Sequence, residues 1–83
     1  MDDRRKRLIY RSNHRGMKEM DILVGHFAAA RADELSDEQL DRLEVLLDEG
    51  DQDLMNWILR KEPTPDHLET DVMRLIREYN KLA

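Results

Sequence analysis

The sequence predicts an all-α protein, a compact bundle of five short helices in a single domain of residues 1–83. Three observations favour this fold class. Apolar residues recur three and four positions apart along the chain, which is typical of amphipathic helices, and no stretch alternates as a strand does. Capping residues precede several of these stretches. Gly and Pro number only three and two, so long loops are not expected.

The first two helices are expected at about Asp3 to Asn13 and at Gly16 to Ala32. Asp2 and Asp3 suit the positive end of the first helix dipole. The apolar stripes are Leu8, Ile9 and Tyr10 in the first helix and Met17, Met20, Val24 and Phe27, flanked by Leu23 and Ala28, in the second. The stretch Asn13-His14-Arg15-Gly16 predicts a tight turn between them, because Asn and Gly tolerate positive φ.

Local signals also bound the remaining three helices. Ser36 and Gln39 predict a capping box for a third helix that runs to about Asp48 and ends at Gly50 as its C′ glycine. Asp51 is the expected N-cap of a short fourth helix, which Pro63 stops. Thr64 is expected to cap a fifth helix from Pro65 to about Lys81. The expected core residues are Leu40, Leu43, Leu46 and Leu47, then Leu54, Trp57 and Ile58, then Leu68, Val72, Leu75, Ile76 and Tyr79.

Charge is distributed unevenly along the chain. Residues 1–18 carry seven Lys and Arg against two Asp, whereas residues 19–83 carry seven against seventeen acids, for a net charge of −5. A globally acidic protein binds nucleic acid poorly without specificity, although the basic first helix leaves a nucleic-acid-binding regulator as an alternative function. No apolar run reaches the length of a membrane span, and the lack of Cys favours a cytoplasmic protein.

Catalysis by this chain alone is not expected. The three histidines, His14, His26 and His67, lack the spacing of a helical metal site, and no nucleophile elbow or dinucleotide fingerprint occurs. The acids around Gly50 do not have the spacing of a calcium loop. We therefore expect no catalytic residue, no metal and no tightly bound cofactor.

One cluster stands out at the start of the second helix. Arg15 and Glu19 are four residues apart, so on a continuous helix they would share a face, and Gly16 leaves bare backbone between them. The simpler interpretation is a surface ion pair of about 0.3–0.5 kcal/mol. The alternative is a surface on which another protein's backbone approaches closely.

The same residues carry a resemblance to a known family. The segment RGMKEMD is similar to the RGxxE signature of the SdhE family of succinate dehydrogenase FAD-assembly factors, and ELSDEQL and LLDEGDQDLMNWIL resemble its following segments. The resemblance extends from about Arg7 to Tyr79. It implies a small five-helix protein without enzymatic activity. Such a chaperone binds the flavoprotein subunit of succinate dehydrogenase, or of fumarate reductase in some bacteria, and promotes covalent attachment of FAD.

The resemblance also implies a site and a setting. Arg15, Gly16 and Glu19 are the signature residues, Asp21 follows them, and the neighbouring His14 and Arg11 complete the predicted partner-binding set. FAD would belong to the partner rather than to this chain, and the free chain is expected to be a monomer in a bacterial cytoplasm. Besides the nucleic-acid alternative, an adaptor for an unrelated protein stays open.

Overall fold

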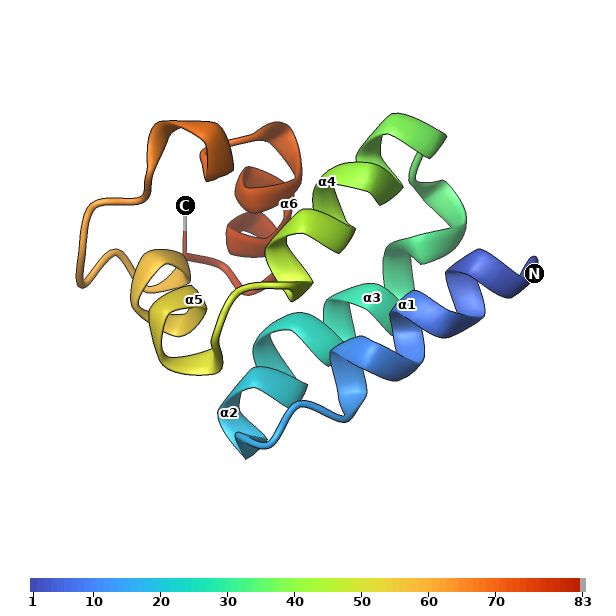
Figure 1. Cartoon of the computed structure of the whole chain (residues 1–83), viewed down its shortest axis with the longest axis horizontal. Helices are drawn as coiled ribbons and strands as arrows, with labels where there is room; N and C mark the ends of the chain where they lie inside the picture. Colours follow the sequence, from blue (N-terminus) through green and yellow to red (C-terminus); the bar gives the residue numbers. More distant parts are fainter. Residues whose placement is uncertain (83) are drawn as a thin grey trace.

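The computed structural model describes residues 1–82, and every regular element within that range is helical (Figure 1). The elements are α1 (Asp3–Asn13), α2 (Lys18–Met20), the π-helical segment η1 (Asp21–Gly25), α3 (His26–Arg31), the 3₁₀ turn η2 (Ala32–Glu34), α4 (Asp37–Leu47), α5 (Asp51–Ile58), the 3₁₀ turn η3 (Asp66–Leu68) and α6 (Asp71–Tyr79). Because α2, η1 and α3 follow one another without a break, the described residues form five helices. The predicted all-α class is confirmed.

The helices surround one hydrophobic core. In Figure 1, α1 lies alongside the α2–η1–α3 helix, α4 lies across them, and α5 and α6 form the other half. The core residues come from every helix: Leu8, Met20, Val24, Phe27, Leu35, Leu40, Leu43, Leu46, Leu47, Leu54, Trp57, Ile58, Leu68, Val72, Met73 and Ile76. Most of the predicted stripes are therefore confirmed. Tyr10 is an exception, because its side chain lies on the solvent face of α1 and is 62% exposed.

The second helix differs from its prediction. It begins at Lys18 rather than Gly16, α-helical geometry ends at Arg31, and five of its residues, Asp21–Gly25, adopt π-helical geometry. This helix also lies very close to α1 at Gly25. A Cβ atom on Gly25 would lie only 2.8 Å from Asn13 Cγ and 3.0 Å from the Ser12 carbonyl oxygen, so glycine alone permits this approach.

The junction between α4 and α5 also differs. The predicted capping box at Ser36 and Gln39 is confirmed, and α4 ends within one residue of its predicted end. However, Gly50 has φ −67° and ψ 151°, so it is the extended N-cap residue of α5 rather than a C′ glycine. Asp51 is the first helical residue and not the N-cap. Its carboxylate accepts a hydrogen bond from Arg15 instead of capping its own helix.

The fifth helix begins six residues later than predicted. Pro65 precedes the 3₁₀ turn η3, Glu69 leaves helical geometry, and Thr70 caps α6 through Met73 N. Arg77, which is only 2% exposed, explains the break. Its guanidinium donates to both Glu69 carboxylate oxygens at 2.9 and 2.7 Å and to the Thr64 hydroxyl at 3.0 Å. If one continuous helix began at Pro65, Glu69 and Thr64 could not both reach the Arg77 guanidinium.

We expect Gly25→Ala to destabilise the fold by about 1–3 kcal/mol, because the new methyl group overlaps α1. Urea unfolding followed by circular dichroism measures this. Gly50→Ala is the matched control: no atom lies within 4 Å of its added Cβ, so the expected change is within about 0.5 kcal/mol. Equal stability of the two variants would contradict the close contact.

The Glu69–Arg77 pair predicts a pH dependence. Hydrogen bonds from Arg77 hold the pKa of Glu69 below its ordinary value of 4.5. A lowered folded pKa stabilises the protein above pH 4.5, and this contribution is lost as the pH falls through the folded value. We expect the difference in urea midpoint between the wild type and Glu69→Gln to shrink as the pH falls from about 6 to about 3. Glu38→Gln, an exposed carboxylate on α4, is the control, and a constant difference for Glu69→Gln would contradict the linkage.

Candidate functional site

The signature residues lie in and just after the loop that joins α1 to α2. Gly16 is exposed and has φ +95°, a left-handed backbone conformation that favours glycine. A Cβ atom there would meet only Asp51 Oδ2, at 3.6 Å. The bare backbone at Gly16 therefore faces open space, and a neighbouring protein could approach it closely.

Arg15 points in the opposite direction, into the fold. Its side chain is 9% exposed. Its guanidinium donates to Asp51 Oδ1 at 2.5 Å, to the Leu47 carbonyl at 2.8 Å and to the Glu49 carbonyl at 2.5 Å. Arg15 thus binds the last carbonyl of α4, the Glu49 carbonyl of the following link and the first residue of α5, and basic side chains often bind carbonyls at a helix C-terminus.

Arg15 and Glu19 do not form a surface ion pair. The chain is non-helical at Gly16 and Met17, so the two residues do not share a helix face as the spacing predicts for a continuous helix. Glu19 is exposed on α2, and no hydrogen bond or salt bridge within residues 1–82 engages its carboxylate. Asp21 is half-buried and accepts a long hydrogen bond of 3.5 Å from the backbone N–H of Arg15. The simpler interpretation of the pair is therefore wrong.

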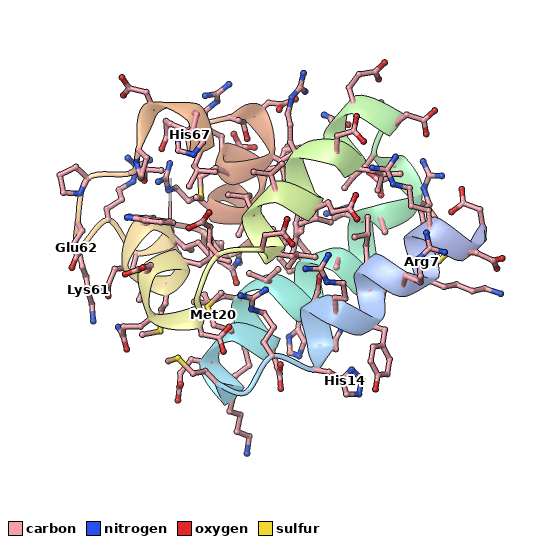
Figure 2. All side chains as sticks on the ribbon, viewed as in Figure 1. Arg7, His14, Met20, Lys61, Glu62 and His67 are labelled. Carbon is pink, nitrogen blue, oxygen red and sulfur yellow. The ribbon has the colours of Figure 1, made fainter. Side chains whose placement is uncertain are left out.

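His14 and Arg11 border an open groove of about 400 Å³ beside the loop. Its lining residues are Tyr10, Arg11, His14, Arg15, Leu47, Gly50 and Asp51. The His14 ring stacks on Tyr10 with centroids 3.8 Å apart, and Figure 2 shows His14 at the outer edge of the molecule. Sequence analysis missed Tyr10 as a surface residue because its neighbours suggested a wider buried stripe. Tyr10 and His14 are four residues apart, and this helical spacing is the signal that could have placed Tyr10 beside the site.

Most of the basic N-terminal residues pair with acids of the fold itself. Arg4 donates hydrogen bonds to Asp41 and, at 3.3 Å, to Glu44. These hydrogen bonds raise the pKa of Arg4, and the bond to Asp41 is the larger cause. Arg11 donates to Asp48 at 2.9 Å. Asp41 and Glu44 belong to α4 and Asp48 is its C-cap residue, so α1 and α4 form a ladder of opposite charges. This pairing removes much of the free positive charge that the nucleic-acid alternative requires.

The described residues offer little for metal or membrane chemistry. No group of three or more His, Asp and Glu side chains in residues 1–82 lies close enough together to hold a metal ion. Across the same range, no helix has the length and apolar character needed to cross a bilayer. Arg11 and Arg15, which border the groove, are already paired with acids, and its lining also includes Leu47 and Gly50. The arrangement is suited to contact with another molecule.

The fold and the candidate site together define the class of protein: it is a small all-helical protein in which an exposed glycine loop lies beside an open groove. The model of a family described as "Flavinator of succinate dehydrogenase" matches residues 6–80. The chain belongs to this family, a family of assembly factors. The resemblance noted from the sequence is thereby confirmed.

Individual relatives agree with the family. Succinate dehydrogenase assembly factor 2, mitochondrial, of Dictyostelium discoideum is 42% identical over 77 residues, covering 93% of this chain and 55% of that protein. The FAD assembly factor SdhE of Acetobacter pasteurianus is 38% identical over 79 residues, covering 95% of this chain and 72% of that protein. Succinate dehydrogenase assembly factor 2-B, mitochondrial, of Drosophila ananassae is 36% identical over 85 residues, covering 52% of that protein. The chain therefore spans about half the length of these mitochondrial relatives.

We expect Arg15→Ala to destabilise the fold by about 3 kcal/mol, because it leaves Asp51 and two helix-end carbonyls without their donor. Arg15→Lys should recover little, since an ammonium lacks the planar fork that reaches three acceptors. Glu19→Ala, four residues away and exposed, is the control with an expected change within about 0.5 kcal/mol. Urea unfolding of the three variants measures this, and a fully stable Arg15→Ala protein would contradict the structural role.

Proposed function

We propose that this protein promotes covalent attachment of FAD to the flavoprotein subunit of succinate dehydrogenase, or of fumarate reductase, by binding that subunit. Family membership supports this function, and the printed names of the relatives describe succinate dehydrogenase assembly and FAD assembly. The single structural observation that carries the proposal is the exposed backbone at Gly16, with φ +95° and open space where a side chain would stand.

The docking surface consists of Gly16, the exposed carboxylate of Glu19, the half-buried Asp21 and the groove bordered by His14 and Arg11. A bare peptide allows the partner's backbone to come within hydrogen-bonding distance. The Glu19 carboxylate, having no partner in the described chain, is available for charge-assisted hydrogen bonds. Tyr10 adds an exposed aromatic ring beside this surface, and aromatic residues are frequent anchors of protein interfaces.

Arg15 serves the same surface from inside the fold. Because its guanidinium holds the α4–α5 junction, the loop is fixed at one end by three hydrogen bonds. The backbone N–H of Arg15 also contacts Asp21, on the far side of Gly16. A loop fixed in this way loses little conformational entropy when a partner binds. The signature thus combines a residue that shapes the loop with residues that face the partner.

Binding can assist flavin attachment without any catalytic group on this chain. A protein that binds one conformation of its partner shifts the population toward that conformation, to the extent that it binds it more tightly. If the favoured conformation holds the partner's own reacting groups close together, attachment is faster. FAD then belongs to the partner, and the chain itself binds no cofactor tightly.

The proposal extends to the oligomeric state, the cellular compartment and the kind of target. We propose that the protein acts as a monomer in the cytoplasm of a bacterium, in accord with its lack of cysteine and its likeness to the Acetobacter protein. The partner, rather than nucleic acid, is the expected macromolecular target, because the α1–α4 ladder occupies Arg4 and Arg11.

The test is to express the flavoprotein subunit with each variant and to measure covalent flavin by in-gel fluorescence, with affinity measured on the purified proteins. We expect Glu19→Ala to weaken binding about tenfold, the effect of one charge-assisted hydrogen bond, and to lower covalent flavin without changing the helical content. Glu38→Ala, an exposed acid on α4, is the matched control.

Position 16 provides the second arm of the same test. Gly16→Arg should abolish binding by filling the open space, at a folding cost of about 1–2 kcal/mol for a side chain at positive φ. Gly16→Asn separates the two effects, because asparagine tolerates positive φ while adding a smaller side chain. Full flavin attachment with both Gly16→Arg and Glu19→Ala, in folded proteins, would overturn the proposal.

A further inference from the structure

The π-helical segment Asp21–Gly25 is held by two side-chain amides from opposite ends of the chain. Asn13, the last residue of α1, donates to the Gly25 carbonyl at 3.2 Å and to the Ile9 carbonyl at 2.8 Å. Asn80, just after α6, donates to the Leu23 carbonyl at 2.9 Å and to the Ile76 carbonyl at 2.8 Å. Each amide therefore joins the end of its own helix to a carbonyl of the π segment.

A π turn needs such support, because its wider backbone spacing departs from the regular i→i−4 hydrogen bonds of a helix. Both amides are half-buried, so their bonds are shielded from competing water. The Asn13 bond also depends on Gly25, since any Cβ there would collide with the Asn13 amide. The two asparagines and the glycine act together on the geometry of one five-residue segment.

This segment lies directly against the candidate site. Asp21 is its first residue, Glu19 precedes it by two residues, and Asn13 stands immediately before His14 at the other end of the loop. The direction in which Glu19 and Asp21 face relative to α1 is therefore set where the amides bind. If this segment adopted α-helical geometry instead, with about one residue fewer per turn, α2 would rotate relative to α3 by roughly 100°.

Resting on the proposed function, we propose that Asn13 and Asn80 are positioning residues of the docking surface: their amides hold the π segment and thereby fix Glu19 and Asp21 in the orientation that the flavoprotein subunit binds. Neither asparagine needs to touch the partner. Asn80 connects the end of the C-terminal helix α6 to Leu23 of the π segment, 57 residues away in sequence.

Three substitutions at Asn80 test this proposal. Asn80→Asp keeps the shape but cannot donate, Asn80→Leu removes the donor without adding charge, and Asn80→Gln keeps a donating amide. Arg74→Gln, at an exposed position of α6, is the matched control. Two quantities are measured: amide hydrogen exchange of residues 18–26 in the free chain, and affinity for the purified flavoprotein subunit by titration.

We expect Asn80→Asp and Asn80→Leu to speed exchange in residues 21–26 and to weaken binding, each by about tenfold, the effect of one lost hydrogen bond. Exchange in α4 should stay unchanged, Asn80→Gln should recover much of the affinity, and Arg74→Gln should match the wild type. If one donor-free variant does not fold, the other decides the result.

Other results overturn the proposal in distinct ways. Unchanged exchange in residues 21–26 would show that the amide does not hold the π segment. Faster exchange with unchanged affinity would show that the segment does not position the docking surface. A wild-type chain that fails to bind the flavoprotein subunit would refute the proposed function and the positioning role together, whereas the exchange data would still decide whether Asn80 holds the segment.

Discussion

The fold depends on three arginine side chains, each of which closes a junction between helices. Arg5 donates to the Ala32 and Leu35 carbonyls between α3 and α4. Arg15 does the same at the junction of α4 and α5, and Arg77 binds the Trp57 carbonyl at the end of α5. A helix leaves its last carbonyls without main-chain donors, and these guanidinium groups supply them. Each arginine also pairs with one acid, namely Asp2, Asp51 and Glu69 respectively.

The chain makes its turns with only three glycines. Helices commonly end on a glycine in left-handed conformation. Here, Arg60 and Lys81 have positive φ, and among the glycines only Gly16 does. Arg60 and Lys81 stand where that glycine usually does, since the Lys61 N–H donates to the Asn56 carbonyl and the Leu82 N–H to the Arg77 carbonyl, both at 2.8 Å. Arginine side chains add long-range hydrogen bonds to these local ones at the ends of α4 and α5. The joints are consequently held by residues far away in sequence, which couples each joint to the packing of the whole globule.

Sequence reasoning succeeded where the signals were local or periodic. The capping box at Ser36 and the apolar stripes of α4 and α5 follow from spacing alone, and the structure confirms them. It failed where a distant residue decided the geometry. Nothing near Thr64 shows that Arg77 uses it as a partner, and nothing near Gly50 shows that Arg15 binds the end of α4. The π segment likewise contains Gly25, whose close contact with α1 no local window of sequence shows.

In the candidate site too, local features are predictable from the sequence and features set by distant residues are not. The spacing of Arg15, Gly16 and Glu19 drew attention to the correct loop, and the exposure of Gly16 agrees with a docking role. The direction of the Arg15 side chain was not predictable, because it depends on where the α4–α5 junction lies in space. The exposure of Tyr10 is not predictable either, because burial of a residue next to Ile9 depends on how α1 is rotated against its neighbours.

The inward orientation of Arg15 limits how this scaffold could be redesigned for a different client. An engineer who treats the whole signature as a recognition code would vary all three positions, and most of those libraries would fail at residue 15 for reasons unrelated to recognition. Retargeting is better confined to the solvent-facing positions, with the guanidinium and its carboxylate retained as part of the frame.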